Sequence, residues 1–247
     1  MARKTVFTLS VLLFTFSLLQ AQGLVPRKII DSPTAGNIRR GQYHFDCKFF
    51  PEGGILGELV VGLTDNLYFG LAYGGSNLIG AGDITTNSGA GIVAQFRVID
   101  ENVLLPAVAV GYNNQEIGPY QLETSDTTYT VKAKGIYAVL SKNYLVFGNL
   151  GIHAGLNYRV DYRLEEKDSK PDLFFLLNKE LNPELSLLAE YDAAINDDQI
   201  EWGYLNVGVS WTFGNQLQLE IDFKNILSNP RFLDVNRELR IVFMDSF

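Results

Sequence analysis

The segment from Ile152 to Glu165 constrains the fold more strongly than any other part of the chain. Its apolar residues alternate strictly with polar or small ones. The first set is Ile152, Ala154, Leu156, Tyr158, Val160, Tyr162 and Leu164, and the second is His153, Gly155, Asn157, Arg159, Asp161, Arg163 and Glu165. A helix would scatter both sets around its circumference, whereas a strand sorts them onto two faces. The segment therefore predicts a long β-strand with an apolar face and a polar face.

Similar segments recur along the chain from Gly41 to its end. About a dozen of them, each of roughly ten residues, match the repeat of a transmembrane β-barrel. They begin near Gly41, Ile55, Leu67, Gly89, Val103, Thr128, Phe147, Asp172, Glu184, Trp202, Gln216 and Arg237. The segments that begin near Ile55, Val103 and Asp172 alternate poorly, so the sequence leaves their registers open.

The connections between these segments alternate in length. Short turns fall at 64–66, 100–102, 181–183 and 213–215, and long polar connections at 74–88, 113–127, 165–171, 196–201 and 225–236. Outer-membrane barrels have short turns on one side and long loops on the other. The sequence therefore predicts an all-β fold, a transmembrane antiparallel up-and-down β-barrel of about 12 strands over residues 41–247.

A soluble β-sandwich that binds a ligand, secreted or periplasmic, is the alternative, because its strands also alternate. Only 19% of the residues are charged, against about 25% in soluble domains. The polar faces are rich in Gly, Asn, Gln, Thr and Ser with charges of both signs, which suits the lumen of a narrow barrel. Closure also pairs the strand edges that lipid cannot satisfy. These features favour the barrel.

The N-terminus has the pattern of a secretory signal peptide. Arg3 and Lys4 precede the apolar run Thr5–Leu19, which is followed by small residues around Ala21. The apolar run is too short to span a bilayer as a helix, which takes about 20 residues. We therefore expect a signal peptide over 1–21, a periplasmic lead-in over 22–40, and a location in the cell outer membrane.

The last strand ends with a pattern of its own. Leu239, Ile241 and Phe243 alternate up to the terminal Phe247. A terminal aromatic residue on such a strand resembles the recognition signal of the bacterial barrel-assembly machinery. Phe243 and Phe247 are therefore the candidate assembly signal, and the expected partners are that machinery and outer-membrane lipid.

Three stretches in the middle of the chain resemble a known family. Leu105–Tyr112, Tyr137–Lys142 and Phe147–Gly155 are similar to segments of the YjbH-like outer-membrane barrel proteins. The resemblance implies an outer-membrane barrel with a role linked to exopolysaccharide or the envelope. It brings no catalytic residues.

Composition and motifs argue against several functions. The net charge of −8 disfavours nucleic-acid binding, which needs a basic surface. The chain has one Cys and two His, too few for a Cys-based zinc site or a His-rich metal site. Neither His44 nor His153 has the neighbours that the barrel phospholipases or barrel proteases use. We expect no enzyme activity, no cofactor and no metal.

The charges on the polar faces form the candidate site. By parity, the lumen receives the basic residues and one histidine, followed by an acidic group: Lys132, Lys134, His153, Arg159, Arg163, Glu190, Asp192, Glu220 and Asp222. The basic residues are expected near Glu190, Glu220 or Asp222.

Two interpretations of these charges remain open. They could line a pathway for a small solute or ion, or form a salt-bridge network that fills the bore. The second is favoured because a barrel of this size has little free space. A small solute or a polysaccharide is the further expected partner. The leading function is a porin-like, non-enzymatic barrel that is a narrow pore or a structural or export-associated envelope component.

Overall fold

The computed structural model describes residues 25–118, 131, 133–159, 170–196, 202–214, 216–227 and 235–247. The expected signal peptide, residues 1–21, lies outside this range, as do Lys132 and Arg163 of the candidate site. No helix in the described part of the chain is both long and apolar enough to cross a membrane.

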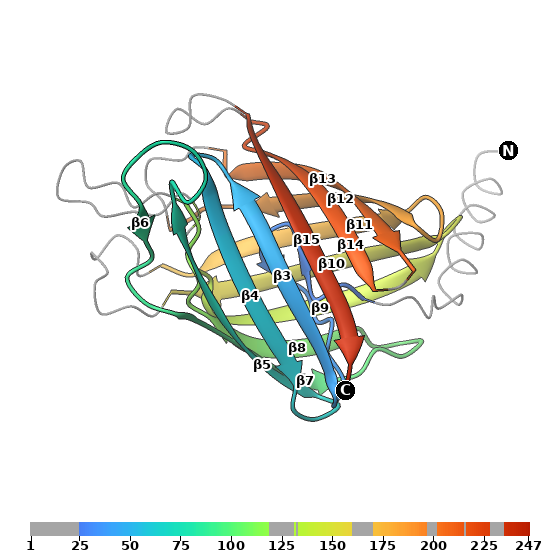
Figure 1. Ribbon diagram of the computed structural model, residues 1–247. Helices are drawn as coiled ribbons and strands as arrows, with labels where there is room; N and C mark the ends of the chain where they lie inside the picture. The colour runs from blue at the N-terminus through green and yellow to red at the C-terminus, as the bar shows by residue number, and fades with distance from the viewer. Residues whose placement is uncertain are drawn as a thin grey trace, which may run out of the picture.

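Twelve strands among the described residues close into an antiparallel barrel (Figure 1). They are β3 (Gln42–Phe50), β4 (Gly54–Gly62), β5 (Leu67–Ser76), β7 (Gly91–Ile99), β8 (Ala107–Asn113), β9 (Gly135–Leu145), β10 (Asn149–Tyr158), β11 (Asp172–Glu180), β12 (Leu185–Asp192), β13 (Tyr204–Phe213), β14 (Leu217–Lys224) and β15 (Asn236–Ser246). The short β6 (Thr85–Thr86) adds to β5. The last strand, β15, pairs with the first, β3, so the sheet has no open edge. The predicted fold class is confirmed, and the β-sandwich alternative is excluded.

The outer surface of the barrel is apolar. Leu71, Ile152, Phe175 and Ile221 are large side chains that point away from the lumen and stay exposed in the isolated chain. The alternation predicted for Leu156–Tyr158 and for Leu217–Phe223 has the expected direction, with Leu156, Tyr158, Ile221 and Phe223 outside. Such a belt on a closed sheet is the surface that a barrel presents to lipid.

The register of β9 differs from the prediction. Because Lys132 and Lys134 are expected in the lumen, strict alternation would place Tyr137 and Val139 on the outer face, but both are buried in the lumen, and Ile136 and Leu140 are exposed instead. The strand begins at Gly135, whose φ of 66° breaks the extended backbone, so Lys134 and Gly135 are both buried and the parity changes there. Alternation counted through such a break places every later side chain on the wrong face.

The largest correction concerns the N-terminal lead-in. From Val25 to Ile38 the chain lies inside the barrel rather than outside it, and its colour marks it as the dark blue segment within the ring of strands in Figure 1. Two short strands, β1 (Lys28–Ile29) and β2 (Ser32–Pro33), pair around a tight turn at Ile30 and Asp31. We call residues 26–35 the lumen hairpin. Its side chains are both charged and apolar, and the lumen supplies partners for both kinds.

Candidate functional site

The lumen hairpin is attached at the short-turn end of the barrel. Residues 36–41 connect it to β3, and Asn37 donates a hydrogen bond to the backbone of Asp65 in the short turn between β4 and β5. Gln95 and Arg97 of β7 donate to the carbonyl oxygens of Gly36 and Ala35. The tip reaches further in, because Asp31 contacts Lys224, the last residue of β14 on the long-loop side.

Four neighbouring strands, β4, β3, β15 and β14, line one side of the lumen with buried charges. We call this side the charged wall, and its members are Asp46, Lys48, Glu58, Glu220, Asp222, Lys224, Glu238 and Arg240. Each of these side chains is at least nine-tenths buried. Charges at this depth need partners, because an isolated buried charge is very costly.

The hairpin supplies several of those partners. Arg27 forms ion pairs with both Asp46 and Glu58. The Lys28 Nζ lies 3.3 Å from a carboxylate oxygen of each of the same two residues. The hairpin therefore places two cations on two wall carboxylates.

Asp31 at the tip makes the opposite arrangement. Its carboxylate lies 2.6 Å from Lys48 Nζ and 2.5 Å from Lys224 Nζ. Burial disfavours the charged carboxylate, but the two ammonium groups outweigh burial and hold the pKa of Asp31 below its usual range. Asp31 is therefore an anion clamped between two wall cations.

The backbone of the hairpin turn is also bound. The amides of Asp31 and Ser32 donate hydrogen bonds of 2.9 and 2.8 Å to Glu190 Oε2 of β12. The other Glu190 oxygen accepts from Asn206 Nδ2 at 2.9 Å. Glu190 thus binds the backbone of the hairpin turn rather than a basic side chain. Alternation alone could not predict this role.

The opposite side of the lumen is apolar. We call it the apolar wall, and it is made by Ala107, Ala109, Tyr137, Val139, Phe174, Leu176 and Leu188 of β8, β9, β11 and β12. Ile29, Ile30 and Ala35 of the hairpin pack against it in one cluster. A second cluster joins Ile38 to Val60, Tyr68 and Val93.

Two glycines make room for the aromatic rings of the apolar wall. The Phe174 ring lies over Gly155, and a Cβ atom there would be 2.1 Å from Phe174 Cζ. Gly111 lies under Tyr137 in the same way, at 2.4 Å. These close approaches explain why both strands have a glycine at the point where an aromatic residue crosses the lumen side.

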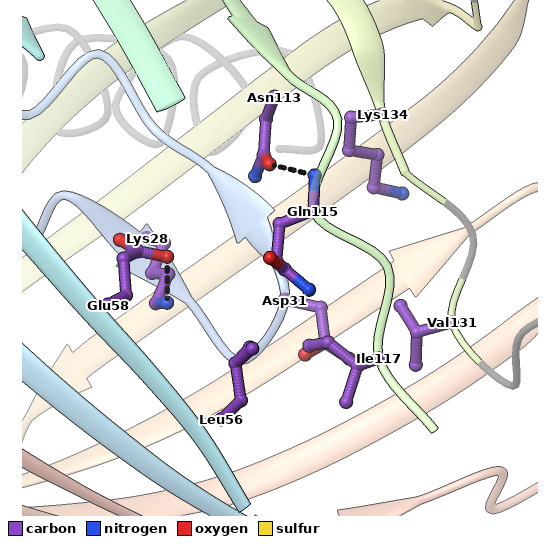
Figure 2. A pocket seen from close by; sticks show the side chains of 9 residues that line it. All are labelled: Lys28, Asp31, Leu56, Glu58, Asn113, Gln115, Ile117, Val131 and Lys134. Atoms are coloured by element: carbon purple, nitrogen blue, oxygen red, sulfur yellow. Dashed lines mark hydrogen bonds and ion pairs between the residues drawn. The ribbon is translucent and has the colours of Figure 1, made fainter. Parts of the chain in front are cut away.

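The long-loop end of the lumen is narrowed by a second segment. Gln115 and Ile117 after β8 are buried, and Ile117 pairs with Val131. A cavity remains between this segment and the hairpin tip (Figure 2), lined by Lys28, Asp31, Leu56, Glu58, Asn113, Gln115, Ile117, Val131 and Lys134. Its free volume for water is about 20 Å³, enough for about one water molecule. No larger solute fits in this cavity.

The described basic residues of the candidate site form ion pairs with acidic residues. Lys134 pairs with Asp192, and Arg159 pairs with Glu116. Arg159 was expected near Glu190, Glu220 or Asp222. The segment after β8 folds inward and brings Glu116 to Arg159, and a position of Arg159 near Glu190, Glu220 or Asp222 stays a prediction. Glu220 instead pairs with Arg240 at 2.7 Å.

His153 and Asp222 lie in the lumen with very different surroundings. His153 has Ser141 Oγ at 2.7 Å and Asn178 Oδ1 at 2.9 Å on its two ring nitrogens. Ser141 Oγ also accepts a hydrogen bond from the Ala35 amide at 2.8 Å, so this pair supports the hairpin. Asp222 is fully buried, and neither of its carboxylate oxygens has a hydrogen-bond partner.

Several residues of this site were missed by the sequence analysis. They are Arg27, Lys28 and Asp31 of the hairpin and Asp46, Lys48, Glu58, Lys224, Glu238 and Arg240 of the wall. Except for Glu58, which lies in a segment that alternates poorly, the wall residues alternate with apolar residues and could have been found by parity. Within the described ranges, no group of three or more His, Cys, Asp or Glu side chains could hold a metal ion.

The barrel is similar to several solved structures. The KdgM porin matches over 83% of this chain and 99% of its own, with 10% identity and a TM-score of 0.48. The NanC porin has the same coverage, with 7% identity and a TM-score of 0.43. The outer membrane channel DcaP of Acinetobacter baumannii matches over 83% of this chain and 96% of its own, with 9% identity and a TM-score of 0.29.

No protein-family model matches the sequence, and no curated protein matches it either. The resemblance to the YjbH-like proteins is therefore not confirmed.

Proposed function

We propose that this chain is a non-enzymatic, porin-like channel of the bacterial outer membrane, held closed by its own lumen hairpin. The observation that carries the proposal is that the hairpin fills the lumen with matched contacts on both sides. Its charges meet the charged wall and its isoleucines meet the apolar wall. An export or exopolysaccharide role has no support in these contacts and forms no part of the proposal.

The outer-membrane location is supported by the surface of the barrel and by the sequence pattern of residues 1–21. The sheet closes on itself and has an apolar outer belt, which suits lipid. Residues 1–21 have the pattern of a signal peptide.

The way in which the hairpin is held favours a gate over a permanent plug. Its own strands have two residues each and pair with each other rather than with the barrel. Leaving the lumen would therefore break no hydrogen bond of the barrel sheet. The turn residue Ile30 has a φ of 55°, which is strained for a β-branched side chain. Stored strain of this kind is found at segments that move.

A disulfide cross-link between the hairpin and the barrel wall tests the proposal. Ala35 and Ser141 touch through the Ala35 amide and Ser141 Oγ, 2.8 Å apart. All variants carry Cys47→Ala, which removes the native cysteine. Arg27→Ala is added to weaken the docking of the hairpin, which gives the loosened barrel. Ala35→Cys and Ser141→Cys are then added to the loosened barrel, so that oxidation can join the hairpin to β9 by a disulfide, which gives the locked form. We expect the loosened barrel to conduct in planar bilayers, the oxidised locked form to be closed, and reducing agent to restore the current.

The control for this experiment is the loosened barrel with Ala35→Cys alone, which cannot form the cross-link. Its current should not respond to oxidation. Heat-modifiable gel mobility checks that each variant is folded. If oxidised and reduced locked barrels conduct equally, the hairpin does not gate the lumen. If none of the loosened forms conducts, the barrel has a structural role instead.

A further inference from the structure

The charged wall has more carboxylates than cations, and this imbalance matters when the hairpin leaves the lumen. The wall contributes the carboxylates Asp46, Glu58, Glu220, Asp222 and Glu238, against the cations Lys48, Lys224 and Arg240. Carboxylates therefore outnumber cations on this side of the lumen. The hairpin offsets part of the difference, because it brings two cations, Arg27 and Lys28, and one carboxylate, Asp31.

The wall cations keep partners on the barrel itself. Lys48 and Lys224 lie 3.1 and 3.2 Å from Glu238, and Arg240 lies 2.7 Å from Glu220. These pairs do not involve the hairpin. Losing Asp31 therefore leaves no wall cation without a carboxylate.

Glu58, Glu190 and Asp222, by contrast, have partners in the hairpin or have no hydrogen-bond partner. Glu58 has ion pairs to Arg27 and Lys28, both of which belong to the hairpin. Glu190 accepts from the hairpin amides of Asp31 and Ser32. Asp222 has no hydrogen-bond partner even when the hairpin is present. The groups that an empty lumen leaves unsatisfied are therefore acids.

The apolar wall faces these acids across the space that the hairpin occupies. When the hairpin leaves, Phe174, Leu176 and Leu188 lose the contacts with Ile29 and Ile30. A ligand that suits both walls must carry a positive charge and an apolar group close together. The hairpin has that combination in Arg27-Lys28-Ile29-Ile30.

We infer that the opened lumen is a binding and permeation site for organic cations that carry an apolar group, and that the lumen hairpin is a tethered competitor for this site. The inference rests on the proposed gating by the hairpin and goes beyond it by naming the class of solute. Carboxylates such as Glu58 would bind the charge, and the apolar wall around Phe174 would bind the remainder of the solute.

Selectivity measurements on the loosened full-length barrel, Arg27→Ala, test the inference. In a KCl gradient the reversal potential should show preference for K⁺ over Cl⁻. Tetrabutylammonium should block the K⁺ current at a concentration about tenfold lower than tetramethylammonium, because its butyl chains can contact the apolar wall. Butyrate, which has the apolar chain with a negative charge, should not block.

Matched variants in the same background separate the two walls. Glu58→Gln should reduce the preference for K⁺, whereas Glu52→Gln, in the exposed turn between β3 and β4, should not change it. Phe174→Ala should reduce the advantage of tetrabutylammonium over tetramethylammonium and leave the preference for K⁺ unchanged.

A second measurement uses the unmodified chain. If the hairpin competes for the site, tetrabutylammonium should increase trypsin cleavage after Arg27 and Lys28, and tetramethylammonium should do so much less. A conducting barrel that prefers anions or shows no preference would overturn the inference and leave the gating proposal standing. Equal cleavage with both cations would overturn the competition. A loosened barrel that never conducts would remove the gating proposal and this inference together.

Discussion

The two walls of the lumen hold the same hairpin by different physical means. The charged wall fixes three points, Arg27, Lys28 and Asp31, each against a partner at a defined position. The apolar wall offers a continuous surface to Ile29, Ile30 and Ala35. Buried ion pairs gain little net free energy over apolar contacts but strongly disfavour wrong placements. Apolar burial is not directional and scales with area.

This difference assigns each wall a role in closure. Without the hairpin, the cations of the charged wall still have Glu238 and Glu220, so part of that wall stays satisfied. The apolar wall has no substitute for Ile29 and Ile30 and would face water. We therefore expect the apolar wall to provide the free energy of closure and the charged wall to set the register of the hairpin.

The largest expected effect comes from removing one charge at the tip. In Asp31→Ala, Lys48 and Lys224 must share Glu238, and breaking a buried pair typically costs about 3–5 kcal/mol. We expect hairpin docking to weaken by an amount of that order, measured from the rate of trypsin cleavage after Lys28. Adding Lys224→Met should restore much of the loss, because Lys48 then no longer shares Glu238 with a second cation. If the double variant is as weak as the single one, the charged wall contributes binding free energy in its own right.

A somewhat smaller loss is expected on the apolar side. Ile29→Ala removes a fully buried side chain from the cluster with Phe174 and Leu176. Such truncations cost about 2–4 kcal/mol, and no compensating second change should restore it. Leu177→Ala, which truncates a residue on the outer face of β11, is the control and should leave trypsin cleavage unchanged. A loss below about 1 kcal/mol would contradict the role given to the apolar wall.

The contrast between the walls also explains what the sequence could predict. Alternation predicted β3, β10, β13 and β14 correctly, because their lumen faces are polar and their outer faces apolar. The three segments that alternate poorly became β4, β8 and β11. Their lumen faces have apolar residues such as Val60, Ala109 and Phe174, which contact the hairpin or the residues next to it. The poor alternation of these three segments therefore reflects the contacts of their lumen faces with the hairpin and its neighbouring residues.

The candidate site was predictable only as a set of faces. Parity placed His153, Glu190, Glu220 and Asp222 on the polar faces, and the structure has them in the lumen. It could not give the hairpin partners of Glu190, because the hairpin is distant in sequence. The partners Ser141 of His153 and Arg240 of Glu220 lie directly opposite on neighbouring strands, so they depend on a register that alternation alone does not supply. Residues 25–38 show neither the alternation of a strand nor the periodicity of a helix. Their local sequence therefore does not indicate that they turn into the lumen.

A comparison of two adjacent isoleucines isolates the strain in the turn. Ile29→Gly and Ile30→Gly remove the same side chain from the same cluster. Only Ile30 has a left-handed backbone, with a φ of 55°, which costs an L-residue about 1–2 kcal/mol and costs glycine little. Ile30→Gly should therefore weaken hairpin docking by about 1–2 kcal/mol less than Ile29→Gly, measured by the same cleavage assay. Equal losses would mean that the turn stores no strain for opening.

The smallest expected effect separates charges that hold the hairpin from one that does not. Asp222 is buried without a hydrogen-bond partner, whereas Glu190 has three. Asp222→Asn removes a buried carboxyl group whose oxygens have no hydrogen-bond partner and should raise the free energy of unfolding by about 1 kcal/mol, with trypsin cleavage of the hairpin unchanged. Glu190→Gln, the matched control, should lower the free energy of unfolding and increase cleavage, because charge-assisted hydrogen bonds to two hairpin amides are weakened. Urea unfolding in lipid vesicles measures the free energy of unfolding. If both variants destabilise the barrel equally, Asp222 belongs to the network that seats the hairpin, and the charged wall is satisfied throughout rather than holding an unsatisfied acid for a cation.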